Sequence, residues 1–475
     1  MMGTALIVIH YIAATLVVLR VLLRPRMEPT TRLVWILIIE VLPLVGILGY
    51  LLFGEIRMRR AEVQRMADVR ERLSGLWRPS PFMIETPPDF ARQVVDANYA
   101  TGGFRAVGGN SAILLPEDDS AIDALVTAID GATEHVHLLF YIWLPDNSGA
   151  RVAEAAIRAA RRGVTVRVIV DALGSRTFVR SFWWGRMLEA GIHGRTAFPW
   201  GNPLYSMIFQ RLDLRNHRKI AIIDNRVGFT GSRNCSDIAF SAKPRFAPWI
   251  DVLFQIEGPV LRQMQAIFLQ DWMSYTGEDL GAMLEFVPAG NDQHVIAQVV
   301  ATGPDRRQGS IADCLCTLIY AAQESCTIST PYYVPDAALD TAIRSAARRG
   351  VKVTMILPER NDSFIVSATS VGFCAGLISA GVRIMLFRPG LLHSKIVTVD
   401  GHMAMIGSAN LDRRSFELNY EMNLLFLDQP LVAKIDARQA SYISRARELT
   451  SGEIRSAPAW KRIRNNLLAL ASPLL

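Results

Sequence analysis

The sequence predicts an α/β protein of two pseudo-symmetric halves, each a mixed sheet flanked by helices, preceded by an N-terminal two-helix transmembrane hairpin. Two apolar runs near the N-terminus predict the hairpin, because each has about 20 residues, the length that spans a bilayer. Beyond them a strand–helix–strand pattern occurs twice with matching letters, which predicts the two halves. The predicted segments are a hairpin over 1–54, a juxtamembrane linker over 55–109, a first half over 110–290 and a second half over 291–475.

The hairpin is predicted from residues 4–23 and 33–53. The first run is interrupted by His10 and Arg20, and it lacks the basic leader and the cleavage site of a signal peptide. The second run is interrupted by Glu40 and Pro43, which we interpret as a helix contact or a kink. Arginines are more numerous after the second run than between the runs, so both termini are expected on the cytoplasmic side.

Composition is consistent with an enzyme that works at a membrane. The chain has 475 residues, of which 50% are hydrophobic, and a mean hydropathy of +0.21. Its net charge of +7 favours an anionic partner, and both anionic lipid and nucleic acid fit that charge. The five cysteines have no metal-binding spacing, so they are expected to be buried thiols in a reducing compartment.

The repeat is visible in identical residues. The letters Ala-Ala-Arg-Arg-Gly-Val occur at 159–164 and again at 346–351, and the segment 141–146 resembles 332–336. Each repeat lies in the same predicted order of strand, helix and strand. In the first half these elements are 135–143, 150–162 and 164–170, and in the second half they are 326–330, 335–349 and 351–357.

A polar motif occurs once in each half with the same internal spacing. It reads His-x-Lys-x4-Asp and is followed by Gly-Ser-x-Asn. Packing alone does not keep polar residues in register across a duplication, so we interpret the two copies as parts of one catalytic site. The first copy contains His217, Lys219, Asp224, Ser232 and Asn234, and the second contains His393, Lys395, Asp400, Ser408 and Asn410.

These residue types suit transfer at a phosphodiester. Paired lysines, serines and asparagines can neutralise and bind the nonbridging oxygens. One histidine can attack phosphorus while the other protonates the leaving alcohol, because an unperturbed imidazole has a pKa of about 6.5. A carboxylate should orient each imidazole, and the candidates are Asp251 and Glu421, which begin or precede predicted strands. Asp224 and Asp400 complete the motif, but they lie at strand ends and are expected to anchor turns.

The sequence has no set of metal ligands and no glycine-rich nucleotide loop. No cofactor and no metal are therefore expected. The charge of the phosphate would be neutralised by Lys219 and Lys395.

The paired motif resembles that of the phospholipase D superfamily. Residues 35–54, the segment from His393 to Glu421 and the ending 472–475 are similar to bacterial cardiolipin synthases, so the resemblance covers nearly the whole chain. It implies that a phosphatidyl group passes from one phosphatidylglycerol to another through a phosphatidyl-histidine, giving cardiolipin and glycerol. The resemblance to the superfamily implies that His217, the histidine of the first motif, is the nucleophile.

The resemblance also implies partners and a location. The expected partners are phosphatidylglycerol and anionic membrane lipid, with no nucleic acid, and a homo-oligomer is left open. The expected location is the bacterial inner membrane, as a multi-pass protein with its catalytic part in the cytoplasm.

Several alternatives stay open from the sequence. A hydrolytic phospholipase D, or a transphosphatidylase that uses another alcohol, needs the same residues. The basic charge permits a nucleic-acid phosphodiesterase, but the two apolar runs favour a lipid substrate. A non-catalytic scaffold does not explain two intact motifs. Ser232 stands where the family often has glycine, and residues 235–240 differ from the family's usual sequence, so the acceptor alcohol is the part of the reaction in which a difference from the family is expected. The basic and apolar tail 460–475 is expected on the membrane or docked on the protein.

Overall fold

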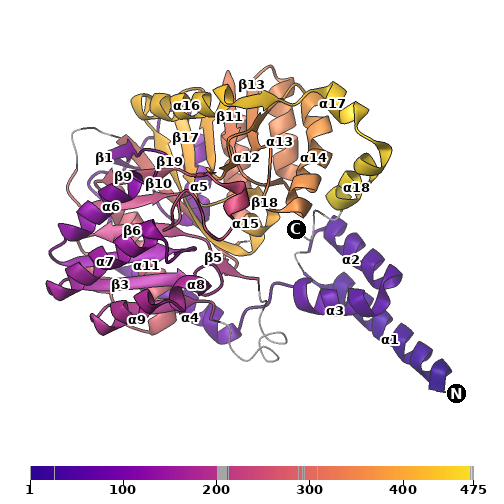
Figure 1. Cartoon of the computed structure of the whole chain (residues 1–475), viewed down its shortest axis with the longest axis horizontal. Coiled ribbons are helices and arrows are strands. Elements are labelled where there is room, and N and C mark those ends of the chain that lie inside the picture. The colour runs from indigo at the N-terminus through magenta and orange to yellow at the C-terminus, as the bar shows by residue number, and fades with distance from the viewer. Residues whose placement is uncertain are drawn as a thin grey trace.

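The chain folds into a large two-part α/β body with a group of N-terminal helices at one side (Figure 1). The computed structural model describes residues 2–25, 27–199, 211, 213–286, 288–290, 293, 295–307, 309–470 and 472.

Three helices form the N-terminal group: α1 (Met2–Leu23), α2 (Pro29–Val41) and α3 (Pro43–Phe53). The apolar run 33–53, in which we interpret Pro43 as a helix contact or a kink, is divided between two helices, because the chain breaks at Leu42, where φ is −127° and ψ is 68°. A proline disfavours helical geometry at the residue before it, which explains a break just before Pro43. Among the residues that the structure describes, no helix is both long enough and apolar enough to cross a membrane.

The segment 55–109, predicted as a linker, is largely packed onto the body. It contains α4 (Arg60–Leu76) and α5 (Arg92–Gly102). Met66 and Leu73 of α4 are buried in one core cluster, and Val94 and Val95 of α5 in another. These two helices therefore belong to the folded body as much as to the membrane-proximal region.

The first half follows the predicted order of elements. Its strands and helices are β1 (Val107–Leu114), α6 (Ala121–Asp130), β2 (His135–Phe140), α7 (Asn147–Arg161), β3 (Thr165–Asp171), α8 (Arg176–Val179), α9 (Phe182–Glu189), β4 (His193–Ala197), β5 (Arg215–Asn216), β6 (Lys219–Ile223), β7 (Val227–Gly231), β8 (Trp249–Ile250), β9 (Leu253–Glu257) and α11 (Val260–Thr276).

The second half repeats this order and adds helices at its end. Its elements are β10 (Val295–Thr302), α12 (Ser310–Ala321), β11 (Ser325–Ser329), β12 (Tyr333–Val334), α13 (Ala337–Arg348), β13 (Lys352–Pro358), α14 (Phe364–Ser379), β14 (Arg383–Phe387), β15 (Leu391–Leu392), β16 (Ile396–Val399), β17 (Met403–Gly407), β18 (Leu411–Asp412), α15 (Arg413–Glu417), β19 (Asn419–Leu427), α16 (Gln429–Ser444), β20 (Ala446–Glu448), α17 (Ser451–Ser456) and α18 (Ala459–Leu470).

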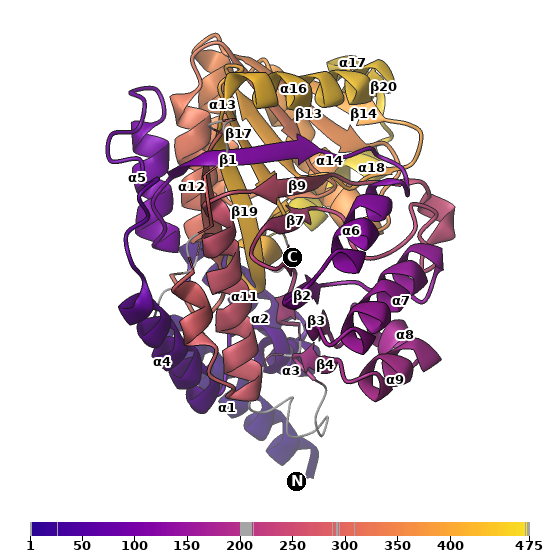
Figure 2. The ribbon, with the colours of Figure 1, turned by 90° about the vertical axis from the view of Figure 1, so that its left-hand side faces the viewer.

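The two halves share one sheet with the same strand order in each. From the centre outward the first half runs β1-β9-β7-β6-β2-β3-β4, and the second half runs β10-β19-β17-β16-β11-β13-β14. β1 and β10 pair antiparallel at the junction. In the first half α11 lies on one side of the strands, and α6, α7 and α9 lie on the other (Figure 2). The duplication predicted from the sequence is thus present as a pseudo-two-fold arrangement.

The repeated Pro-Asp pairs have a local reason. Asp146 and Asp336 are the N-caps of α7 and α13, and their carboxylates accept hydrogen bonds from the backbone N–H groups of Gly149 and Leu339. A carboxylate in this position satisfies an N–H group that lacks a partner within the helix. The same cap therefore begins the same helix in both halves.

Candidate active site

Short strands cross between the halves where the two motifs meet. β5, just before His217, pairs with β19 of the second half, and β15, just before His393, pairs with β8 of the first half. The backbone N–H of His217 donates to the carbonyl of Tyr420 at 2.9 Å, and that of His393 donates to Ile250 at 2.8 Å. Each histidine is therefore held against a strand of the opposite half.

This crossing gives each imidazole a carboxylate from the other half. Nδ1 of His217 lies 3.0 Å from Oε2 of Glu421, and Nδ1 of His393 lies 2.8 Å from Oδ1 of Asp251. All four side chains are buried. A carboxylate at Nδ1 fixes the tautomer in which Nε2 carries the free lone pair.

Charges inside this buried cluster shift the pKa values of its members. Burial lowers the pKa of His217 to about 4, against the opposing effect of Glu421, and burial likewise lowers the pKa of His393. Burial alone would raise the carboxylate pKa values, but the adjacent histidine, lysine and serine together outweigh it and lower the pKa of both Asp251 and Glu421 to about 2. Near neutral pH each pair is a neutral imidazole beside an ionised carboxylate.

The two motif serines contact these carboxylates. The Ser232 hydroxyl donates to Oδ1 of Asp251 at 2.6 Å, and the Ser408 hydroxyl donates to Oε2 of Glu421. Each hydroxyl has one proton, which is committed to a carboxylate, and both residues are fully buried. This differs from the expectation that the serines bind the phosphate, because the carboxylate lies within reach of the same hydroxyl.

Two buried ammonium groups face this centre. Lys219 Nζ donates to the carbonyl of His217 at 2.6 Å, and Lys395 Nζ donates to the carbonyl of His393. Burial, together with the nearby Lys395, lowers the pKa of Lys219 to about 7, and burial lowers the pKa of Lys395 to about 8. A phosphate anion beside them would restore their preference for the charged form.

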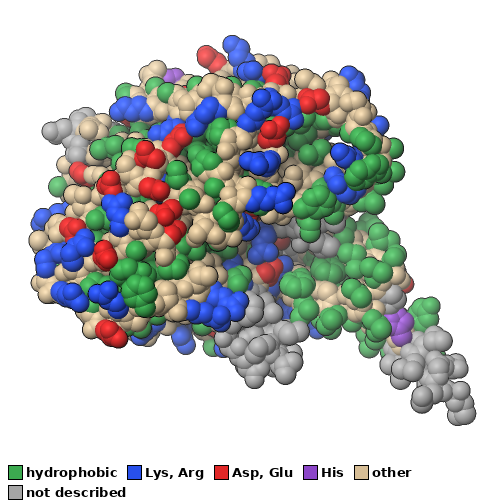
Figure 3. All heavy atoms as spheres, viewed as in Figure 1, with side chains coloured by type: hydrophobic (Ala, Val, Ile, Leu, Met, Phe, Trp, Pro, Cys, Tyr) green, Lys and Arg blue, Asp and Glu red, His purple; other side chains and the backbone are tan. Residues whose placement is uncertain are grey.

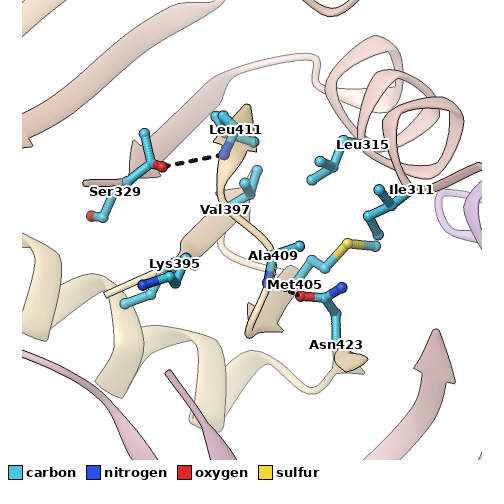
Figure 4. A pocket seen from close by; sticks show the side chains of 11 residues that line it. Ile311, Leu315, Ser329, Lys395, Val397, Met405, Ala409, Leu411 and Asn423 are labelled. Carbon is cyan, nitrogen blue, oxygen red and sulfur yellow. Dashed lines mark hydrogen bonds between the residues drawn. The ribbon is translucent and has the colours of Figure 1, made fainter. Parts of the chain in front are cut away.

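Lys395 lies against a small, mainly apolar cavity. Behind it lies a cavity of about 10 Å³, lined mainly by apolar side chains that include Leu315, Val397 and Met405 (Figure 4). A space of this size is at the lower limit for one water molecule. The cavity is therefore too small for a lipid headgroup and serves as the apolar backing of the lysine.

The motif asparagines carry polar atoms without partners. The Nδ2 of Asn234 and the Oδ1 of Asn410 are buried, and neither atom has a hydrogen-bond partner among the described residues. The Oδ1 of Asn234 does accept from the backbone N–H of Ile142 at 3.2 Å. Unpaired buried amide groups are uncommon in folded proteins, so they indicate a place where a polar ligand enters.

The motif aspartates point into the fold. The Asp224 carboxylate accepts hydrogen bonds from three backbone N–H groups, at 133–135, and the Asp400 carboxylate accepts the same three, at 323–325. Both residues have a φ of 52°, the left-handed geometry of a tight turn. These contacts support the anchoring role that the sequence predicts for them.

The sequence interpretation missed aromatic and basic neighbours of the histidines. The ring of Tyr141 lies 4.7 Å from the ring of His217, and that of Trp249 lies 4.7 Å from that of His393. Tyr141 begins the repeated segment 141–146, and this repetition could have indicated from the sequence that it lies near the site. Arg218 lies between His217 and Lys219, so strand alternation puts it on the opposite side, where it is buried and donates to Asp271 at 2.5 Å.

No metal site can be assigned to these residues. In the described part of the chain, no group of three or more histidine, cysteine, aspartate or glutamate side chains is arranged to hold a metal ion. The polar groups that converge are two imidazoles, two ammonium groups and two amides, a set that suits a phosphate oxygen.

Two family models match the chain. A family model described as cardiolipin synthase, phospholipase D-like domain, matches residues 125–272 and 315–442. A second model, described as phospholipase D–nuclease N-terminal, matches residues 11–55.

Individual relatives cover almost the whole chain. Cardiolipin synthase A of Klebsiella pneumoniae is 38% identical over 471 residues, which is 97% of this chain and 96% of the relative. Cardiolipin synthase A of Escherichia fergusonii is 37% identical with the same coverage. Among solved structures, a phosphatidylserine synthase of Haemophilus influenzae has a TM-score of 0.58 at 13% identity, covering 81% of this chain and 100% of that one, which supports the fold alone.

Proposed function

The chain belongs to the cardiolipin synthases with phospholipase D-like domains, and from that membership we propose that it converts two phosphatidylglycerol molecules into cardiolipin and glycerol. The observation that carries the proposal is the crossed pair of His217–Glu421 and His393–Asp251 around two buried lysines. Two oriented imidazoles on one phosphate suit two successive displacements.

In the first step Nε2 of His217 attacks the phosphorus of one phosphatidylglycerol. The P–N bond forms as the P–O bond to the headgroup glycerol breaks, and His393 gives its proton to that glycerol oxygen. The anionic phosphate in the site favours protonation of His393 in the complex. Lys219 and Lys395 stabilise the charge on the nonbridging oxygens, together with the unpaired Nδ2 group of Asn234.

In the second step a headgroup hydroxyl of another phosphatidylglycerol gives its proton to His393. The resulting oxygen attacks phosphorus, the P–N bond breaks, and His217 is regenerated. One phosphodiester replaces another, so the exchange needs no external energy source. Ser232 and Ser408 act as positioning residues that hold the carboxylates in place.

Membrane attachment through residues 1–54 completes the proposal, with the catalytic part on the cytoplasmic face of the bacterial inner membrane. The match of residues 11–55 to an N-terminal family segment and the exposed leucines of α1–α3 support it. A membrane-bound site obtains both of its lipid substrates from the bilayer.

Purified protein on phosphatidylglycerol vesicles tests the function, with products resolved by mass spectrometry. The expected products are cardiolipin and glycerol in equal amounts. Phosphatidic acid with no cardiolipin would instead assign hydrolysis, in which water replaces the second lipid. Added ethanolamine or another alcohol in the same assay reports on transfer to other acceptors.

A further inference from the structure

Both ends of the helix pair α2–α3 contact the same side of the catalytic body. Just before α2, the Glu28 carboxylate accepts from Arg413 of α15 at 2.8 Å. Just after α3, the carbonyl of Arg57 accepts from the backbone N–H of Arg211 at 3.0 Å. The body lies on one side of any bilayer, so both of these chain positions lie on that side.

The end of α1 is held at the same place. Arg20 makes two hydrogen bonds to the Glu55 carboxylate, at 2.7 and 2.9 Å, and Arg24 approaches it at 3.7 Å. The Tyr50 hydroxyl donates to the same carboxylate at 2.9 Å. The chain therefore leaves this point along α2 and returns to it along α3.

Neither helix of the pair is long enough to cross. α2 has 13 residues and α3 has 11, and a rise of about 1.5 Å per residue gives lengths well below a hydrocarbon core of about 30 Å. The two helices pack tightly, with the rings of Trp35 and Tyr50 5.4 Å apart. A Cβ on Gly46 would lie 2.6 Å from the carbonyl of Ile38, so the sharp return requires glycine there.

The outward side of the pair is apolar. Apolar side chains cover α2 and α3 in Figure 3, and an exposed apolar surface of this extent needs a partner in water. The members of this surface that are more than half exposed are Leu33, Leu37, Val41, Leu42, Leu44, Val45 and Leu48.

We propose that α2–α3 is a re-entrant helix pair that enters the leaflet facing the catalytic body and returns to the same side. The inference rests on the proposed membrane function, and it replaces the expected crossing of residues 33–53. Arg413, which holds the base of the pair, lies three residues after Asn410 of the catalytic motif. Phosphatidylglycerol of that leaflet is therefore delivered beside the active site.

Cysteine labelling with a membrane-impermeant maleimide tests the topology in the full-length chain. All five native cysteines are buried, and both Thr30, at the start of α2, and Ala61, at the start of α4, are exposed. In membrane vesicles of defined orientation, Thr30→Cys and Ala61→Cys are expected to be labelled from the same side.

Labelling of the two variants from opposite sides would overturn the re-entrant arrangement, because it requires a crossing between them. Labelling of Thr30→Cys only in detergent would also overturn it, since the start of α2 would then lie inside the bilayer. The readout is independent of catalysis, so loss of the cardiolipin product would refute the proposed function without affecting this result.

A second inference rests on α18, whose apolar stripe faces outward. Trp460, Ile463, Leu467 and Leu470 are 59–69% exposed, and their spacing places them on one helical face. The opposite face packs on α14, where a Cβ on Gly372 would lie 2.9 Å from that of Ala469. A helix that only docks on the protein turns its apolar face inward, so this orientation points to an external partner.

We infer that this stripe lies in the interface of an anionic leaflet. Residues 459–475 contain Lys461, Arg462 and Arg464 and no acidic residue, which complements anionic headgroups. The Arg464 guanidinium lies over the ring of Phe364, itself exposed on α14, at 4.9 Å. α18 lies on the same side of the body as α1–α3 (Figure 1).

An environment-sensitive fluorophore on Leu467→Cys tests the contact in full-length protein reconstituted in phosphatidylglycerol bilayers. The emission is expected to shift to the blue and to be quenched by lipids with spin labels on their acyl chains. The control is Ile113→Cys, on β1 at the far side of the body and 50% exposed, which should stay accessible to aqueous iodide. Equal iodide quenching at both positions would overturn the inference, as would protection of Leu467 that depends on protein concentration and not on lipid.

Discussion

Each catalytic histidine has its Nδ1 committed to a carboxylate, which leaves Nε2 for the substrate. The two imidazoles do not have equal tasks in a two-step transfer. One must form the covalent bond, and the other must move a proton twice.

Replacing either histidine by alanine should lower turnover at least about a thousandfold, because His217→Ala removes the nucleophile and His393→Ala slows both proton transfers. After incubation with phosphatidylglycerol, peptide mass spectrometry should find a phosphatidyl adduct on His217 in the His393→Ala protein and none in the His217→Ala protein. His402→Ala, at an exposed position, serves as the control. An adduct on His393 would reverse the assignment of the nucleophile.

The lysine pair gives a pH dependence of defined sign. Each ammonium is charged below its pKa, so the contribution is complete at low pH and is lost as pH rises through about 7 for Lys219 and about 8 for Lys395. The alkaline limb of kcat/KM, which reports the free enzyme, is expected in that range. The limb of kcat should lie at higher pH, because bound phosphate raises both pKa values.

A pH–rate series on mixed micelles measures both limbs. Lys352→Met, at an exposed position of β13, should leave them unchanged. A kcat limb at or below the kcat/KM limb would contradict the assignment of the lysines to the phosphate.

Arg218 breaks the symmetry between the halves, because Ser394 occupies its position in the second motif. Arg218 is buried, donates to Asp271, and reaches the backbone carbonyls of Thr302 at 3.1 Å and Glu421 at 3.3 Å. It therefore holds the strand of Glu421 against that of His217 from behind. We expect it to be a positioning residue for this pair alone.

Arg218→Lys should lower the free energy of unfolding by about 3 kcal/mol, because a buried ion pair loses its geometry. It should also lower kcat with little change in KM and move the acid limb of kcat/KM, since the His217–Glu421 contact changes. Ser394→Ala is the matched control, expected within about 1 kcal/mol of wild type. Destabilisation with an unchanged pH profile would show a purely structural role.

At the scale of elements, the turn after each catalytic strand is fixed by one carboxylate. The carboxylates of Asp224 and Asp400 each accept hydrogen bonds from three backbone N–H groups of the segment that begins the neighbouring strand. These turns set the register of β6 with β2 and of β16 with β11, and thereby the position of each lysine.

Asp224→Asn should destabilise the protein by about 2–4 kcal/mol, because charge-assisted hydrogen bonds are lost while the left-handed turn is kept. The kcat of the folded protein should stay near that of wild type. Chemical denaturation and activity measured on the same samples separate the two effects. The control is Asp130→Asn, which removes only an exposed pair with Arg158. A large fall in kcat without loss of stability would instead place Asp224 in the chemistry.

The elements show what a sequence can and cannot predict. The strand–helix–strand repeats and the motif strands were predictable, because they follow from local periodicity. The crossing of Glu421 to His217 was not, because it depends on the pairing of β5 with β19, residues about 200 apart in sequence. The motif serines, by contrast, meet their carboxylates within one half, where β7 pairs with β9 and β17 pairs with β19. Pro43 did indicate the break between α2 and α3. The return of the chain to the same side of the body was not predictable, because it depends on the contacts of Glu28 and Glu55.

At the scale of the whole molecule, one sheet runs through both halves, yet each half holds an incomplete site. The first half carries His217 without Glu421, and the second carries His393 without Asp251. The halves should therefore be inactive apart and active together.

Expression as two fragments, 1–290 and 291–475, tests this expectation, because three strand pairings join them: β1 with β10, β5 with β19 and β8 with β15. Co-purified fragments should form cardiolipin, and each fragment alone should form none. A 1–290 fragment with His217→Ala should still co-purify but stay inactive. Activity of one fragment alone would contradict a shared site.

The exchange of carboxylates between halves has a consequence for ancestry. A single ancestral unit with this geometry could act only as a homodimer, in which each copy supplied the carboxylate that orients the histidine of the other. Fusion of two copies made that encounter intramolecular, so assembly no longer depended on protein concentration. After fusion the sequences of the two copies could also diverge independently. One copy could then keep a guanidinium behind its catalytic strand while the other kept a hydroxyl, a difference that a homodimer cannot encode.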